Sequence, residues 1–168
     1  DLLIPKPQGG RRVIALYQGI VWLWGKARRS VLRAWEDFFS KSYPWFNLST
    51  GRSTTDSVWR RAARAEVGAR DNMVSGCVFW DLSSFYEMVQ LRKLHGECQA
   101  VEYPMSILNV CLQSYRWIRV LSLESIVADG IFPIDGVLAG SFSATYEVKA
   151  YVAQAVRRVT NKHLMVRI

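Results

Sequence analysis

The chain has 168 residues, half of them hydrophobic, and a net charge of +8. This length and hydrophobic content suffice for one buried core, and they exclude a compositionally disordered chain. No stretch approaches the roughly 20 apolar residues of a membrane span, so we expect no membrane partner.

The positive charge belongs to the first part of the chain. Residues 1–70 contain 13 Lys and Arg and 5 acidic residues, whereas residues 71–168 contain 9 of each kind. Because these cations alternate with glycine and aromatic residues, the pattern favours binding of a polyanion over a merely solubilising surface. Three cysteines without CxxC spacing, Cys77, Cys98 and Cys111, are typical of reduced core thiols and favour an intracellular location.

Along residues 1–70 the sequence predicts a hairpin and two helices. Gly9 and Gly10 permit positive φ between two extended segments, 2–7 and 11–16, which predicts a hairpin with a basic tip. Apolar residues then recur at helical spacing from 20 to about 39: Leu23, Ala27, Val31, Ala34 and Phe38. Thr54 or Thr55 is expected to cap a second helix that ends at Arg70 and carries Arg60, Arg61 and Arg64 on its polar face.

Strands and helices alternate in the second half. We expect a strand at 74–80, a short helix at 86–94 that closes at Gly96, and a hairpin formed by 118–121 and 125–127. Pro104 begins a helix to about 116 that buries Ile107, Leu108, Cys111 and Tyr115. Gly140 opens the last helix, whose buried stripe is expected to be Val148, Tyr151, Val152, Ala155, Val156 and Val159.

Asp81 follows the apolar run 77–80, and an aromatic residue, Tyr86, follows five positions later. A carboxylate at the end of a buried strand is a rigid metal ligand at the rim of a sheet. The stretch resembles motif A of the reverse transcriptase palm. The resemblance implies that Asp81 binds Mg²⁺, with the backbone carbonyl of Leu82 as a further ligand, and that Tyr86 gates the sugar and selects deoxynucleotides. Otherwise Phe85 and Tyr86 are core aromatic residues.

The basic hairpin is similar to the fingers hairpin of group II intron and non-LTR reverse transcriptases. Lys6 and Arg12 flank its glycine turn, although Val13 stands where that pattern usually has proline. The resemblance implies that both cations clamp the phosphates of a nucleoside triphosphate, arginine by bidentate contact and lysine as a point charge.

Gly140 and Ser141 resemble motif B, a turn into a long helix that lines the nucleotide site, with Ala139 where many members have glutamine. The family's motif C, an adjacent pair of aspartates, does not occur. The chain starts at Asp1 and stops in the apolar run 164–168, so we expect a segment truncated before motif C and the thumb. Four other carboxylates lack the spacing to replace the pair and are expected to be solvated: Glu87, Asp129, Asp135 and Glu147.

We therefore predict an α+β fold, a polymerase fingers-palm fragment with an antiparallel sheet packed by helices, in which 1–70 is fingers-like and 71–168 palm-like. The implied activity is RNA-directed DNA synthesis with Mg²⁺, from an RNA template, a DNA primer and deoxynucleoside triphosphates, in the intact parent enzyme; the segment alone is expected to be inactive. The alternatives are a non-catalytic basic RNA- or DNA-binding module or degenerate polymerase remnant, and a protein-interaction domain without salt-sensitive binding.

Overall fold

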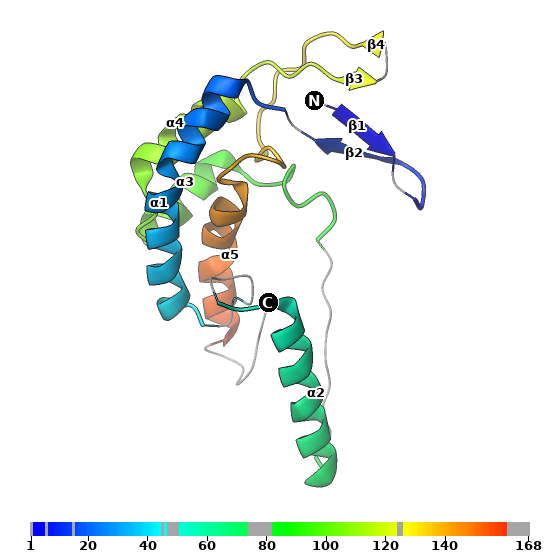
Figure 1. The fold of residues 1–168 in the computed structure, drawn as a ribbon, viewed down its shortest axis with the longest axis vertical. Coiled ribbons are helices and arrows are strands. Elements are labelled where there is room, and N and C mark those ends of the chain that lie inside the picture. Colours follow the sequence, from blue (N-terminus) through cyan, green and yellow to red (C-terminus); the bar gives the residue numbers. More distant parts are fainter. Residues whose placement is uncertain are drawn as a thin grey trace.

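The computed structural model describes residues 2–5, 7–14, 16–44, 46, 51–73, 82–123 and 126–160 (Figure 1). Helices and short strands both occur, which confirms the α+β class. In chain order they are β1 (Leu2–Pro5), β2 (Arg11–Ile14), α1 (Gly19–Ser42), α2 (Thr54–Arg70), α3 (Leu91–Ala100), α4 (Met105–Tyr115), β3 (Ser122–Leu123), β4 (Ile126–Val127) and α5 (Ala144–Thr160). None of the described helices has both the length and the apolar character needed to cross a bilayer.

The strands form one small sheet in the order β2-β1-β3-β4. β1 and β2 pair antiparallel, and φ is +89° at Gly9 and +78° at Gly10, which confirms the predicted glycine-turn hairpin. β3 and β4 pair antiparallel as well, so a second hairpin is present as predicted, but its first strand lies at 122–123 and not at 118–121. A single parallel pair, Leu2 with Ser122, joins the two hairpins.

The hydrophobic core is helical. Figure 1 places α1, α3, α4 and α5 beside one another, with the sheet at one end of this group. Among the strand residues whose side chains are described, none is buried, whereas the largest fully buried apolar side chains lie on α1, α3 and α4: Leu32, Phe39, Leu94, Leu108 and Tyr115. Within the described residues the helices therefore pack mainly on one another, because the strands are too short to present a broad apolar face.

α1 confirms the predicted helix but buries another face. Leu23, Val31 and Phe38, which were expected inside, are 65%, 47% and 50% exposed. The buried side instead contains Trp35, whose Nε1 donates to the carbonyl of Val101, 3.0 Å away. Apolar residues occur all around this helix, so their periodicity alone selects the wrong stripe.

α2 begins one residue earlier than its predicted caps. Ser53 is the N-cap, its Oγ accepts from the amide of Asp56, and the carboxylate of Asp56 accepts from the amide of Ser53. This capping box stabilises the helix end without any tertiary contact. Figure 1 shows α2 extending away from the other helices, and Gly68 is the one buried residue among its described positions.

α3 begins at Leu91, so the helix expected at 86–94 is placed wrongly. Residues 83–88 form turns instead, and α3 continues through Gly96 to Ala100. The amide of Leu91 donates to Oδ1 of Asp135 at 2.9 Å, which supplies the N-terminal acceptor that a local side chain would normally provide. Asp135 is exposed, as expected of a solvated carboxylate, and it has the additional role of anchoring the start of a helix.

The helix predicted from Pro104 is confirmed as α4, and all four residues expected inside it are buried. The last helix, α5, begins at Ala144 and not at Gly140, because 138–143 form a turn. Its predicted stripe is confirmed in part: Val148 and Val156 are buried, whereas Ala155 and Val159 are exposed.

Candidate functional site

The predicted site residues divide into those that the structure describes and those outside it. Asp81 and Lys6 lie outside the described residues, and of Arg12 only the backbone, in β2, is described. Leu82 is 56% exposed. Among the described residues no group of three or more His, Cys, Asp and Glu side chains is close enough to hold a metal.

Two backbone hydrogen bonds join the segment around Tyr86 to the segment that leads to Gly140. The amide of Val137 donates to the carbonyl of Tyr86 at 2.8 Å, and the amide of Gly136 donates to the carbonyl of Val89 at 2.9 Å. The structure thus brings Tyr86 next to Val137, which lies three positions before Gly140. These two predicted site elements are separated by about fifty residues in the sequence, and they share one region of the fold.

Gly136 is required for this close approach. Its φ is +96°, in the left-handed region that glycine favours, and a Cβ atom there would lie 3.0 Å from the carbonyl oxygen of Glu87. Any larger residue would separate the two segments or strain the backbone.

The ring of Tyr86 is half-buried. It lies edge-on to Phe85 with 6.1 Å between ring centroids, and Phe85 in turn contacts Tyr151 of α5 at 6.5 Å. The aromatic pair is therefore anchored on α5, and part of the Tyr86 ring remains accessible to a ligand. This placement suits both expectations for the pair, a core role for Phe85 and a contact surface on Tyr86.

The turn at 138–143 places Gly140 at the surface and Ser141 in the interior. Gly140 has a φ of +102° and is exposed, whereas Ser141 is 9% exposed. Oγ of Ser141 lies 3.3 Å from the hydroxyl of Tyr115 and 3.1 Å from Oγ of Ser143. Since the hydroxyl of Ser141 is used inside the protein, a ligand at this turn would meet Gly140 and the main chain.

Glu147 is fully buried, so the expectation that it is solvated is wrong. One carboxyl oxygen is hydrogen-bonded to the hydroxyl of Tyr115, and burial raises the pKa of the group above its ordinary value of 4.5. The burial of Glu147 could have been recognised in the sequence, because Glu147 lies between Ala144 and Tyr151 on one face of α5.

Exposed cations and tryptophan rings occur on both α1 and α2. Nζ of Lys26 lies 4.3 Å from the ring centroid of Trp22, and the guanidinium of Arg28 lies 4.9 Å from that of Trp24. Trp22 is 54% exposed, and Trp59 of α2 is 70% exposed. The accessible cations of these helices include Arg29, Arg33, Arg60, Arg61 and Arg64. Exposed indole rings next to cations provide both stacking surfaces and charge for a single-stranded nucleic acid.

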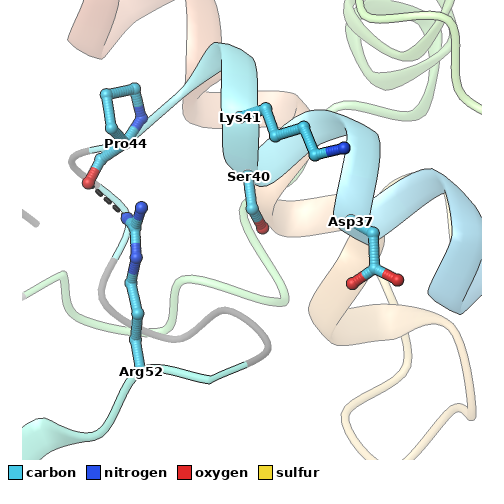
Figure 2. A pocket seen from close by; sticks show the side chains of 5 residues that line it. All are labelled: Asp37, Ser40, Lys41, Pro44 and Arg52. Carbon is cyan, nitrogen blue, oxygen red and sulfur yellow. Dashed lines mark hydrogen bonds between the residues drawn. The ribbon is translucent and has the colours of Figure 1, made fainter.

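A hollow at the C-terminal end of α1 is lined by Asp37, Ser40, Lys41, Pro44 and Arg52 (Figure 2). The guanidinium of Arg52 donates to the carbonyls of Pro44 and Phe46, the latter at 3.1 Å. These bonds attach the start of α2 to the end of α1. Because Arg52 is engaged by the main chain and Asp37 offsets the charge of Lys41, this hollow has a structural role.

The expected metal ligands, Asp81 and the backbone carbonyl of Leu82, have suitable chemistry for Mg²⁺, since a carboxylate and a backbone carbonyl are the oxygen donors that this ion prefers.

Comparison of the chain with protein-family models, with curated proteins and with solved structures finds no match.

Proposed function

We propose that the chain is the fingers and palm portion of an RNA-directed DNA polymerase. The observation that carries the proposal is the hydrogen bond between Tyr86 and Val137, because it joins the aromatic residue of the motif A-like stretch to the segment that enters the motif B-like turn. A nucleotide site requires these two segments to meet. The glycine turn of the β1–β2 hairpin supports the proposal further, since it is the element from which a phosphate clamp would extend.

Each proposed role follows from the chemistry of the side chain. Asp81 and the carbonyl of Leu82 would hold Mg²⁺, which when bound activates the primer hydroxyl and stabilises the leaving pyrophosphate. Lys6 and Arg12 would bind the triphosphate, and the exposed Gly140 would allow the nucleotide to approach the main chain.

The ring of Tyr86 would exclude the ribose 2′-hydroxyl, which gives a direct test. In primer extension by a protein that contains this chain and supplies an aspartate pair after it, Tyr86→Val should improve the use of ribonucleotides relative to deoxynucleotides by about 10- to 100-fold. Tyr86→Phe keeps the ring and should retain the wild-type preference. An unchanged ratio in Tyr86→Val would remove Tyr86 from sugar selection, and a wild type that extends no primer with deoxynucleotides would refute the polymerase proposal.

The second candidate is a non-catalytic module that binds RNA or DNA. The stacked Lys26–Trp22 pair and the exposed Trp59 favour it, because both would serve a nucleic acid without any catalytic site. This module predicts binding of single strands and no extension of a primer.

Both candidates predict salt-sensitive binding through α2. For single strands, each phosphate contact contributes about −0.7 to the slope of log K against log salt concentration. Changing Arg60, Arg61 and Arg64 together to glutamine should therefore flatten the slope by about 2 in a fluorescence-anisotropy titration with a labelled oligonucleotide.

The matched control changes Arg92, Lys93 and Arg116 to glutamine, because these cations are equally exposed and lie on or after α3 and α4. This control should leave the slope near the wild-type value. Equal slopes in both triple variants would indicate that the charge effect is unspecific, and an absence of salt dependence would favour a protein-interaction domain.

A further inference from the structure

The turn at 138–143 is connected to two helices by a chain of buried polar side chains. Ser141 Oγ lies 3.3 Å from the Tyr115 hydroxyl on α4, and this hydroxyl also bonds Glu147 on α5. In the other direction Ser141 Oγ contacts Ser143 Oγ, which lies 3.2 Å from Sγ of Cys111. All five side chains are at most 9% exposed.

Within the described residues the turn has further restraints, both in its main chain and at Phe142. The amide of Ser141 donates to the carbonyl of Leu138 at 2.9 Å, and the amide of Ser143 donates to Oγ of Ser141 at 3.4 Å. Phe142 in the same turn lies edge-on to Trp24 of α1, with 5.7 Å between ring centroids, whereas Gly140 is exposed and adopts a positive φ. The side-chain connections of Ser141 and the packing of Phe142 therefore both contribute to where Gly140 is presented at the surface.

The direction of the hydrogen bonds between Glu147, Tyr115 and Ser141 depends on whether Glu147 carries a proton. The Tyr115 hydroxyl carries one hydrogen and has two oxygen neighbours, Ser141 Oγ and Glu147 Oε2, so it donates to one and accepts from the other. If Glu147 is neutral, its own hydrogen is donated to Tyr115 and Tyr115 donates to Ser141. Burial is the largest influence on the pKa of Glu147 and favours this neutral form, although the side chains of Tyr115, Ser143 and Cys111 favour the charged form. Oε1 makes no hydrogen bond of ordinary geometry among the described residues, so one of the two oxygens is poorly stabilised as an anion.

We propose that Tyr115 and Glu147 are positioning residues for the Gly140–Ser141 turn. In this arrangement Glu147 is neutral and donates a hydrogen bond to Tyr115, which in turn donates to Ser141. The inference rests on the proposed function in one respect: the turn positioned in this way is the one that would contact a nucleotide.

Hydrogen exchange tests the positioning without any nucleotide. In Tyr115→Phe, the amides of Ser141 and Ser143 should exchange about tenfold faster than in the wild type, the factor that corresponds to one lost hydrogen bond. Tyr103→Phe is the matched control, since Tyr103 is 2% exposed and its hydroxyl has no hydrogen-bond partner within the described part of the chain. It should leave both exchange rates unchanged, and equal rates in Tyr115→Phe and the wild type would overturn the proposal.

Two substitutions of Glu147 test the neutral form. Glu147→Gln keeps a donor and carries no charge, so both exchange rates should stay within about twofold of the wild type, whereas Glu147→Leu should raise them about tenfold. Circular dichroism confirms that each variant is folded. If the Ser141 and Ser143 amides exchanged as fast in a folded Glu147→Gln variant as in Glu147→Leu, the ionised carboxylate would be needed. That result would refute the neutral donor.

The pH dependence of unfolding supplies an independent readout. An acid whose pKa is raised on folding releases a proton when the chain unfolds, so stability falls as pH rises from 4.5 to the folded value. In this window the unfolding constant should increase with pH by up to about tenfold per pH unit more in the wild type than in Glu147→Gln. Equal slopes would mean that Glu147 is ionised in the fold.

Other titratable groups face this cluster from the surrounding elements, and they remain in both proteins of that comparison. They are Tyr17, Cys98, Tyr103, Cys111 and Tyr115, each influenced by Glu147, and Arg119, which donates to the carbonyl of Tyr115 at 3.1 Å. Burial raises the pKa of these thiols and phenols further above the window that begins at pH 4.5, so they stay protonated there and add nothing to either slope.

Calorimetric titration with dTTP and Mg²⁺ connects the turn to the proposed function. Tyr115→Phe should weaken dTTP binding by about tenfold, and Tyr103→Phe should not. A wild type that does not bind dTTP would count against the polymerase proposal, whereas the exchange rates would still decide whether Tyr115 and Glu147 position the turn. If Tyr115→Phe showed faster exchange of the Ser141 and Ser143 amides but bound dTTP as tightly as the wild type, the proposal that this turn contacts the nucleotide would be refuted.

Discussion

Asp81→Ala is expected to reduce primer extension by roughly 10³-fold or more in a protein that contains this chain and supplies an aspartate pair after it, because a lost metal ligand removes several kcal/mol of transition-state stabilisation. The effect should appear with deoxynucleotides at saturating Mg²⁺. Asp81→Asn should be nearly as inactive, since an amide keeps the size of the side chain without its charge.

Asp129→Ala is the matched control, because Asp129 is an exposed carboxylate in the loop that precedes Ile131. It should extend primers at the wild-type rate. Activity of Asp81→Ala close to the wild type would exclude Asp81 from the mechanism, and it would leave the binding module as the better description of the chain.

Leu108→Ala is expected to lower the free energy of unfolding by about 2 to 5 kcal/mol. Leu108 lies on α4, is 0% exposed and belongs to the core cluster formed with α1, α3 and α5. Its truncation removes apolar contacts and leaves a cavity that neighbouring aromatic residues can fill only in part. Chemical denaturation with urea, followed by circular dichroism, measures the loss directly.

Val110→Ala on the same helix provides the comparison, since Val110 is 46% exposed and should cost less than about 1 kcal/mol. A similar loss in both variants would indicate that helix propensity, and not core packing, determines their stability. The difference between the two therefore measures the contribution of the helical core.

The sequence predicted elements whose signals are local. Two glycines between extended segments define the β1–β2 hairpin, and the apolar spacing that begins after Pro104 defines α4 and its buried side. The buried side of α1 could not be predicted in this way. Gly25 lies against the ring of Phe142, a residue more than one hundred positions later, and long-range contacts of this kind distinguish the inner face from the exposed stripe with Leu23.

The hydrogen-bond partners of two carboxylates were beyond local reasoning, although the burial of Glu147 follows from its place on one face of α5. Asp135 accepts from the amide of Leu91 across 44 positions, and Glu147 meets Tyr115 across 32, so neither role leaves a short motif. Both carboxylates were predicted to be solvated because acidic residues usually are. Motif spacing assigned Tyr86 and Gly140 to one site, and the structure brings their segments together through the hydrogen bond between Val137 and Tyr86.

The burial of two thiols has a practical consequence. Cys98 is 0% exposed and Cys111 is 3% exposed, and burial raises the pKa of both, so neither forms the reactive thiolate while the chain is folded. An alkylating reagent can modify them only after the surrounding helices separate. The rate of their modification therefore reports opening of the core in dilute samples, without denaturant and without an added dye.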